Sequence, residues 1–235
     1  MEREPTLLGK GMYPLSRAAR LVGEEARTVR RWLRGYSWKH RDGLPHSSGP
    51  LWPLQFASDE DLSREQVLSF HDLLELRTVA RFISLGVSLR AIRATIDVAR
   101  EYLGDYPLQS EGFVTDGKRI FLEAAERAGD PQLLDVRGRQ FAMDAVIRPS
   151  LLDGIQHGRN GAALRWFPVP KKKVIVLDPQ VQFGEPIIAE AGVPTDTLAS
   201  AYKAEGEDAK MVAKLYRITP AAVKAAVAFE HRLAA

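Results

Sequence analysis

The chain has 235 residues, 45% of them hydrophobic and 27% charged, a composition typical of a folded protein with one large or two small domains. It contains no cysteine, which excludes disulfide bonds, a thiol nucleophile and the thiolate metal sites of many sensors. No apolar run has the length of a membrane-spanning helix and the first residues lack the apolar core of a signal peptide, so we expect a soluble, cytoplasmic protein.

The charge is distributed unevenly along the chain. Residues 13–41 hold eight Lys or Arg and only two Glu, a net charge of +6, whereas residues 174–235 have a net charge of −2. The basic block favours a polyanionic partner such as nucleic acid, and the acidic part favours a different task. A basic face that is merely solvated is the alternative.

Residues 13–34 predict two short helices on either side of Gly23. Ser16 is a candidate N-cap of the first helix, and Gly23 is expected to end it. The second helix has an apolar inner face, formed by Val29, Trp32 and Leu33. Two short helices with a glycine at their turn are typical of a helix-turn-helix.

The outer face of the second predicted helix carries the groups that read DNA. These groups are Arg27, Thr28, Arg30, Arg31 and Arg34. Arginine binds guanine edges through two hydrogen bonds, and both residue types bind phosphate. We therefore predict a recognition helix and include Arg17 of the first helix among the DNA contacts; a small helical hairpin with a solvated face is the alternative.

The next segments differ in pattern. Residues 35–57 are rich in glycine and proline and predict an irregular or hairpin segment, and residues 63–103 have helical periodicity with a break at Gly86. Residues 113–122 predict a β-hairpin, because Asp116 and Gly117 suit a type I′ turn. We expect a second hairpin over residues 134–142 and a helix over residues 144–157.

The last part of the chain predicts two short strands followed by three short helices. Residues 174–177 form the first expected strand, and Thr195 or Asp196 is expected to cap the first helix. Thr219 is a candidate cap for the third helix, with Pro220 at its first position. A plain helical packing unit explains this pattern as well as a specialised domain does.

The N-terminal residues resemble the DNA-binding head of MerR-type regulators. The similar segments are Tyr13 to Tyr36, Phe70 to Arg77 and Phe82 to Ile92, the last containing the Leu-Gly-Val-Ser-Leu turn. The resemblance implies a winged helix-turn-helix, in which Lys39, His40 and Arg41 fall in the wing and touch the DNA backbone.

Residues 174–231 are similar to a bacterial domain associated with VapB-type antitoxins. The matching positions keep their order and spacing: Asp178-Pro179, Gly184 to Ile188, Val193-Pro194 and Thr219 to Val223. The resemblance implies a partner toxin of the PIN-like ribonuclease class and assigns no catalytic residue to this domain.

We therefore expect an α+β protein with three parts. A MerR-like winged helix-turn-helix occupies residues 1–104, β-hairpins and a helix form a connecting segment over 105–173, and a small tri-helical domain entered by short strands occupies 174–235. The expected function is that of a homodimeric antitoxin of a type II toxin–antitoxin pair, which neutralises its toxin and represses its own operon by binding operator DNA. The alternative is a MerR-like transcription regulator with a ligand-sensing C-terminal half.

An enzyme is the third class, and the sequence gives no support for it. The five histidines lack metal-ligand spacing with carboxylates, and no serine, histidine and acid are placed to form a triad. We therefore expect no catalytic residue, no metal and no cofactor.

Overall fold

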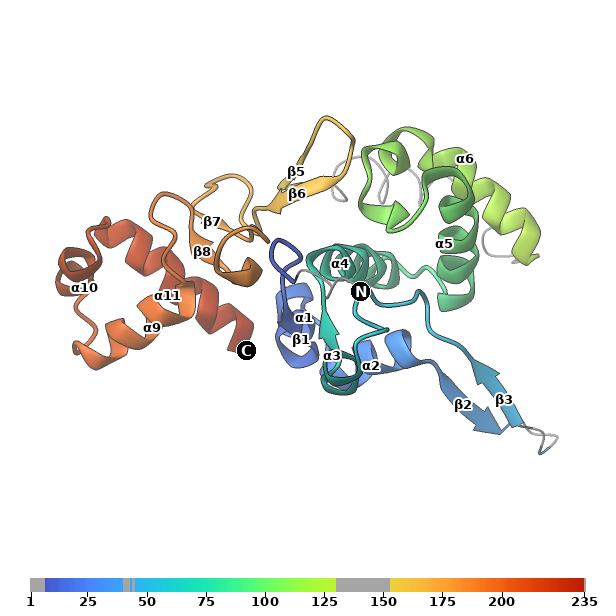
Figure 1. The fold of residues 1–235 in the computed structure, drawn as a ribbon, viewed down its shortest axis with the longest axis horizontal. Helices are drawn as coiled ribbons and strands as arrows, with labels where there is room; N and C mark the ends of the chain where they lie inside the picture. The colour runs from blue at the N-terminus through green and yellow to red at the C-terminus, as the bar shows by residue number, and fades with distance from the viewer. Residues whose placement is uncertain (1–6, 40–42, 44, 130–152, 235) are drawn as a thin grey trace, which may run out of the picture. The chain divides into compact units, whose positions relative to one another are not determined.

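The computed structural model describes residues 7–39, 43, 45–129 and 153–234, which form helices and small antiparallel sheets (Figure 1). These residues divide into two compact units. The head unit comprises the described residues of Tyr13–Leu152 and Arg159–Ala162, and the tail unit those of Met1–Met12, Asp153–Gly158 and Ala163–Ala235. The predicted α+β class is confirmed. None of the helices in the described ranges is long and apolar enough to cross a membrane.

The head unit is mainly helical. Its helices are α1 (Leu15–Val22), α2 (Ala26–Arg34), α3 (Glu60–Glu65), α4 (Phe70–Ser84), α5 (Leu89–Leu103) and α6 (Glu111–Ala128), with the 3₁₀ turn η1 (Pro107–Gln109) before α6. Its strands form two antiparallel pairs, β1 (Tyr13–Pro14) with β4 (Val67–Leu68) and β2 (Tyr36–Lys39) with β3 (Pro45–Ser48). The largest side chains of its core are fully buried: Tyr13, Phe70, Phe82, Phe113 and Phe121.

Helix α4 is the centre of the head unit, because most of its side chains are buried around the whole helix. It begins with a capping box: the Ser69 hydroxyl accepts from the Asp72 backbone N–H, and the Asp72 carboxylate accepts from the Ser69 backbone N–H. It ends before Gly86, whose φ of 84° favours glycine. The helix break predicted at Gly86 is therefore confirmed.

Residues 113–122 form part of α6, so the predicted hairpin there is wrong. Ser110 caps the helix by accepting from the Phe113 N–H at 3.2 Å. The rings of Phe113 and Phe121 both contact Phe82 of α4, with centroids 6.3 and 6.2 Å apart. Burial of one apolar helix face against α4 and α5 outweighs the local turn preference of the Asp-Gly pair, and the expectation of β-structure directly after α5 fails with it.

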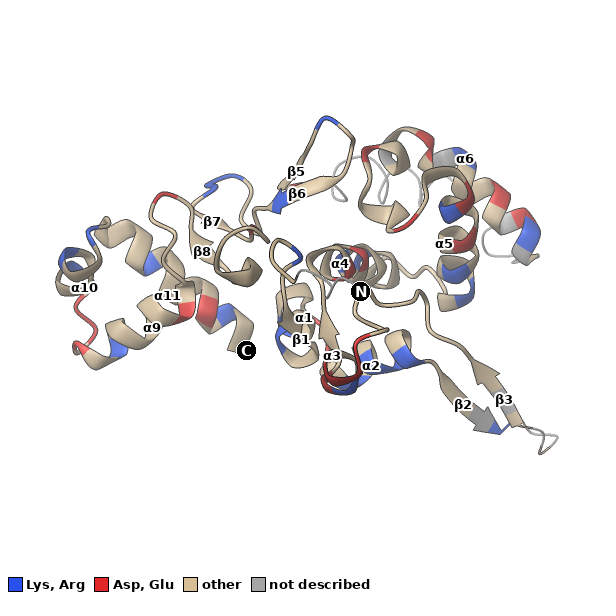
Figure 2. Ribbon diagram, viewed as in Figure 1, with Lys and Arg blue, Asp and Glu red and all other residues tan. Residues whose placement is uncertain are grey.

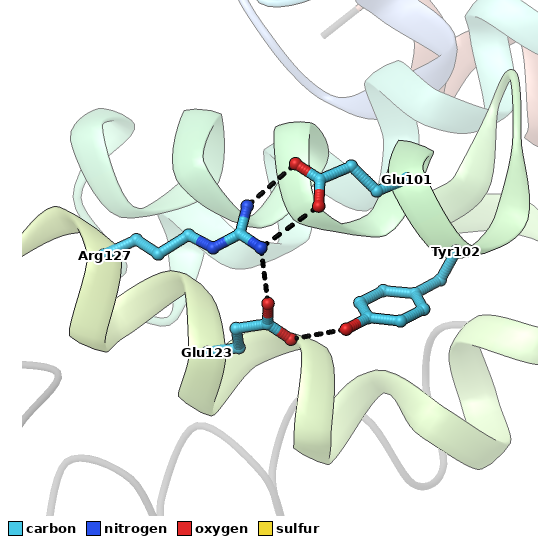
Figure 3. Close-up of polar contacts among 4 residues, drawn as sticks. All are labelled: Glu101, Tyr102, Glu123 and Arg127. Carbon is cyan, nitrogen blue, oxygen red and sulfur yellow. Dashed lines mark hydrogen bonds and ion pairs between the residues drawn. The ribbon is translucent and has the colours of Figure 1, made fainter.

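An exposed polar cluster joins α5 to α6 (Figure 3). The Arg127 guanidinium donates to both carboxylate oxygens of Glu101, at 2.8 and 3.1 Å, and to Glu123 at 2.5 Å. The Tyr102 hydroxyl donates to the other oxygen of Glu123 at 3.0 Å. All four groups lie at the solvent edge of the helix pair, so they hold the helices in register without belonging to the core.

Three other predictions for this part of the chain have different outcomes. The helical stretch predicted over 63–103 is interrupted at Gln66, which has a φ of 57°, and by strand β4. The helix predicted over 144–157 is wrong at its end, because Ile155–His157 form strand β5. The hairpin predicted over 134–142 and the start of that helix lie outside the described residues.

The tail unit contains the two strands and three helices expected over residues 174–235, together with an antiparallel pair over residues 155–166 that the sequence did not predict. The strands are β5 (Ile155–His157), β6 (Ala163–Trp166), β7 (Ile175–Val176) and β8 (Ile187–Ile188), in the antiparallel pairs β5–β6 and β7–β8; the helices are α9 (Thr195–Ala204), α10 (Ala209–Tyr216) and α11 (Pro220–Ala234). Thr219 caps α11 by accepting from the Ala222 N–H at 3.1 Å, as predicted. The first described residues also belong to this unit, since the Met12 N–H donates to the Phe183 carbonyl at 2.8 Å.

Two predicted helix caps are wrong. Helix α1 begins at Leu15 after Pro14, so Ser16 lies inside it. Helix α9 begins after Pro194, and Thr195 is a buried residue of its first turn whose hydroxyl donates to Glu230 at 2.5 Å. The Thr195 side chain is used to tie α9 to α11, which leaves it unable to act as a cap.

Candidate nucleic-acid interface

Helices α1 and α2 are joined by a three-residue turn that begins at Gly23. Gly23 ends α1 in the left-handed conformation, with a φ of 76°, and its backbone N–H donates to carbonyls of the last turn. The buried side chains of α2 are Val29, Trp32 and Leu33, with exposed fractions of 5% or less. The predicted inner face of the second helix is therefore confirmed.

The opposite face of α2 gathers the predicted cationic groups. The guanidinium-bearing residues Arg27, Arg30, Arg31 and Arg34 are exposed and Thr28 is half-buried. Figure 2 shows the basic residues along α2. Arg17 lies on α1 and is half-buried. The fold thus places four arginines of one short helix where a polyanion can reach them.

These arginines have intramolecular contacts that a phosphate can replace. Arg27 pairs with Glu25 at 2.6 Å, and both side chains are largely exposed, at 83% and 66%. Such a surface pair contributes little to stability. Arg30 donates to the Gln66 amide oxygen at 2.9 Å, and the Arg31 guanidinium lies 4.4 Å from the centre of the Tyr36 ring. These contacts orient the side chains and leave the helix face open.

The β2–β3 hairpin follows α2 directly and occupies the place of the predicted wing. Lys39 is exposed at the end of β2, opposite Pro45. His40 and Arg41 lie outside the described residues. Gly35 joins α2 to the hairpin with a φ of 75°, and a β-carbon there would lie 2.0 Å from the Ser48 carbonyl oxygen. Only glycine fits this entry to the hairpin.

Arg93 of α5 holds the base of the hairpin. Its guanidinium donates to the Pro50 and Gly49 carbonyl oxygens, at 2.6 and 2.8 Å, and to the Ser48 hydroxyl at 2.8 Å. Sequence reasoning missed this residue, because it lies more than 40 positions from its partners within an ordinary helical pattern. Its role is positional: it ties the base of the hairpin to α5.

Asp72 of α4 holds the segment that follows the hairpin. Besides its capping bonds, its carboxylate accepts from the Trp52 indole N–H at 3.0 Å and the Gln55 backbone N–H at 3.2 Å. Burial raises the pKa of Asp72, although the bonds to Ser69, Trp52 and Gln55 act in the opposite direction. The sequence marked Asp72 only as part of a family motif, without this role.

The tail unit offers a different surface. Met211 and Leu215 of α10 lie one turn apart and are exposed, at 43% and 55%, so they form a small apolar pair on one side of the helix. The loop before α10 is acidic, with Glu205, Glu207 and Asp208 exposed. An apolar pair beside acidic groups suits a protein partner better than DNA.

Comparisons with known proteins agree with the division of the chain into a head unit and a tail unit. A family model described as "Protein of unknown function (DUF433)" matches residues 175–229, which lie within the tail unit. A curated relative from Mycobacterium tuberculosis (strain ATCC 25618 / H37Rv), named "Putative antitoxin VapB45", is 26% identical over 217 residues, 89% of each chain. The chain is thus similar to an antitoxin-like protein over most of its length.

A solved structure resembles most of the chain. It is described as the X-ray crystal structure of Rv2018 from Mycobacterium tuberculosis, and it has a TM-score of 0.65 at 20% sequence identity. The likeness covers 92% of this chain and 96% of that chain. At this identity the likeness shows a shared fold and carries no assignment of activity.

Proposed function

We propose that this chain is the antitoxin of a type II toxin–antitoxin module, which binds its own operator through the head unit and its toxin through the tail unit. The observation that carries the proposal is the row of exposed arginines on α2, set directly before a hairpin that Arg93 holds in place. The name of the curated relative, which matches 89% of both chains, supports the toxin–antitoxin assignment.

In this proposal the head unit acts as a MerR-like winged helix-turn-helix. Helix α2 enters the major groove, where Arg27, Arg30, Arg31 and Arg34 supply bidentate donors for guanine O6 and N7 or for phosphates. Thr28 contributes a hydroxyl for phosphate. The β2–β3 hairpin follows the neighbouring backbone, with Lys39 as its described cation and His40 and Arg41 as further expected contacts.

We also propose a homodimer, since one recognition helix makes few base contacts and such heads pair across palindromic sites. The apolar face of α5 is not available for this purpose, because Ile92, Ile96 and Ala99 are at most 1% exposed and α6 packs along α5. The tail unit is therefore the better candidate for the dimer contact. Light scattering at micromolar concentration, with and without DNA, tests this; a strict monomer in both conditions would contradict it.

The proposed toxin partner is a PIN-like ribonuclease. The apolar pair of Met211 and Leu215 provides the buried centre that a protein interface needs, and the acidic loop beside it faces the basic rim of a nuclease. In this arrangement the tail unit blocks the entry of RNA, and the antitoxin itself carries out no reaction.

Two experiments test the proposal. The reading frame adjacent to this gene is expressed alone and together with this chain, and we expect growth arrest in the first case and rescue in the second. DNA from upstream of the gene pair is then titrated with the full chain by fluorescence anisotropy, and we expect binding that weakens with salt. Absence of rescue together with sequence-specific DNA binding would favour the MerR-like regulator, and absence of both would reject the proposal.

The double variant Met211→Glu with Leu215→Glu tests whether the apolar pair on α10 contacts the toxin. We expect it to lose rescue while retaining operator binding. Lys210→Glu with Lys214→Glu makes the same number of substitutions on the same helix, at exposed charged positions, and serves as the control. Equal rescue by both variants would remove α10 from the toxin interface.

A further inference from the structure

The head unit contains a cavity of about 370 Å³ that the DNA and toxin roles do not use. The residues that line it come from the segment after the hairpin, from α4 and α5, and from the connection between α5 and η1: Trp52, Pro53, Leu54, Gln55, Glu75, Ile96, Arg100, Asp105, Tyr106 and Pro107. Its volume lies in the range of small-molecule sites, about 300–1,000 Å³.

The walls of this cavity are largely apolar, and part of them is buried. Trp52 is 5% exposed, and its indole N–H is already bonded to Asp72, so the ring presents only its apolar surface. Ile96 and Pro107 are also buried. Tyr106, at the rim, is held in the left-handed conformation with a φ of 53°, a strained geometry for a non-glycine residue that is often found at ligand sites.

The wall of the cavity contains two buried acceptors. The Glu75 carboxyl is buried, at 1% exposure, and one of its oxygens accepts from the backbone N–H groups of Leu108 and Gln109 at 2.8 and 3.3 Å. The side-chain oxygen of Gln55 is buried and has no hydrogen-bond partner within the described part of the chain. A buried acceptor without a donor costs about 1–3 kcal/mol, which a ligand N–H would recover.

The cationic group at the cavity is already neutralised. Arg100 donates to Asp105 at 2.9 Å, and this pair lies on the more exposed side. Asp105 therefore balances Arg100, and Glu75, once it has lost its proton, adds a negative charge to that of Asp72 behind Trp52. A ligand that accepts hydrogen bonds or carries negative charge finds few donors there, whereas one that donates finds two acceptors.

We propose that this cavity binds a small organic cation, a primary amine or amidine with an apolar body. The cationic head donates to the Glu75 carboxylate and to the Gln55 side-chain oxygen, and the apolar body lies between Trp52 and Ile96. The site is distinct from the ligand-sensing C-terminal half of the alternative function, because it is built entirely from the head unit, and it does not depend on the antitoxin assignment.

The protonation of Glu75 gives this binding a characteristic pH dependence. Burial raises the pKa of Glu75 to about 8, with a further contribution from Asp72, while the two backbone donors and Arg100 act against the rise. Asp105 and Tyr106 are the other titratable groups at the cavity. The amine must displace the Glu75 proton, so its apparent affinity rises up to about tenfold per pH unit as the pH approaches 8.

The probe is 2-phenylethylamine, titrated into the full chain with the backbone amide signals of Leu108 and Gln109 followed by NMR. Two molecules of similar shape serve as comparisons, neutral 2-phenylethanol and anionic 3-phenylpropanoate. We expect saturable shifts with the amine, at least about tenfold weaker binding of the alcohol, and tighter amine binding at pH 8 than at pH 6.5.

Two variants of the cavity sharpen the test. Glu75→Gln keeps an acceptor for the backbone donors and removes the charge, and Gln55→Ala removes the unpaired acceptor from a loop position. We expect each to weaken amine binding, and Glu75→Gln to abolish its pH dependence. Glu65→Gln, on the exposed surface of α3, is the matched control and should bind as the unmodified chain does.

Three results would overturn the proposal. They are the absence of shifts at about 10 mM amine, the weak end for a ligand of this size; tighter binding of the anion than of the amine; and unchanged amine binding in Gln55→Ala together with Glu75→Gln. If Glu75→Gln does not fold, Gln55→Ala and the three probes still decide the matter.

Discussion

The head and tail units bury different kinds of side chain. Among the described residues, the head unit buries Gln66, Ser69, Asp72, Glu75, Thr78, Thr95 and Gln109, whereas the tail unit buries only Asp178 and Thr195 among polar and charged residues. Two of these groups hold irregular backbone: Asp72 accepts from the segment between the hairpin and α3, and Glu75 accepts from the backbone of η1. The tail unit consists of short helices with apolar contacts and needs few of them.

The exposed surfaces of the two units also differ in chemical character. The head unit presents single-sign charge on α2, which suits a polyanion. The tail unit presents an apolar pair beside acidic residues. The irregular segments of the head unit require a buried polar framework, whereas the packed helices of the tail unit do not, and four predictions test this difference.

The largest effect is expected from Asp72→Ala. The variant leaves the Trp52 indole and the Ser69 backbone N–H without their buried acceptor, and we expect a loss of about 3 kcal/mol in the stability of the head unit. Hydrogen exchange of the α4 amides measures this loss of stability.

Thr195→Val is the matching variant of the tail unit. It removes one hydrogen bond and should lower the stability by about 1 kcal/mol, with faster hydrogen exchange only in α9 and α11. The expected order of the two effects would be contradicted if Thr195→Val accelerated exchange in α9 and α11 more than Asp72→Ala accelerated exchange in α4.

The second effect concerns DNA affinity. Arg27→Ala with Arg30→Ala should weaken operator binding by about 2 kcal/mol or more and reduce the slope of log K against log[salt] by about 1 for each lost phosphate contact. Fluorescence anisotropy at several salt concentrations measures both quantities. Lys203→Ala with Lys224→Ala removes two exposed cations from the tail unit and is the control. Unchanged affinity and slope in the head variant would show that α2 is not the recognition helix.

The third effect is a pH dependence of stability. Because the folded-state pKa of Glu75 is raised to about 8, this carboxyl holds its proton in the folded protein and has lost it in the unfolded chain between about pH 4.5 and 8. The stability contribution is therefore present at low pH and is lost as the pH rises through this window, by up to about 1.4 kcal/mol per unit.

Urea unfolding at several pH values measures this slope. In a Trp166→Phe background the remaining tryptophans, Trp32, Trp38 and Trp52, all belong to the head unit, so their fluorescence reports on it alone. Glu75→Gln should flatten the slope, and Glu65→Gln should not. The same slope in all three proteins would mean that Glu75 does not control it.

The smallest effect is expected at the polar cluster of α5 and α6. Arg127 makes several short contacts, yet its side chain is 47% exposed and that of Glu101 is 55% exposed (Figure 3). Exposed ion pairs contribute less than about 1 kcal/mol each, so Arg127→Ala should destabilise the head unit far less than Asp72→Ala. A double-mutant cycle with Glu101→Ala measures the pair. A coupling above about 2 kcal/mol would contradict this ranking.

The sequence by itself determined the features with local signals. The apolar face of α2, its arginine face and the turn at Gly23 follow from helical spacing and from glycine at a positive φ. The three tail helices and the Thr219 cap follow in the same way. The breakers of residues 35–57 indicated an irregular segment or a hairpin, and only the resemblance to MerR-type heads placed Lys39 in a wing.

Only the tertiary structure decided the rest. The Asp116-Gly117 pair by itself predicts a turn. It lies in α6 because burial of Phe113 and Phe121 against Phe82 outweighs the turn preference of the pair. Arg93 reaches the hairpin base across more than 40 residues, and Glu75 becomes an uncommon buried acid only because η1 folds onto α4. Such contacts join distant parts of the chain, and neither periodicity nor turn chemistry records them.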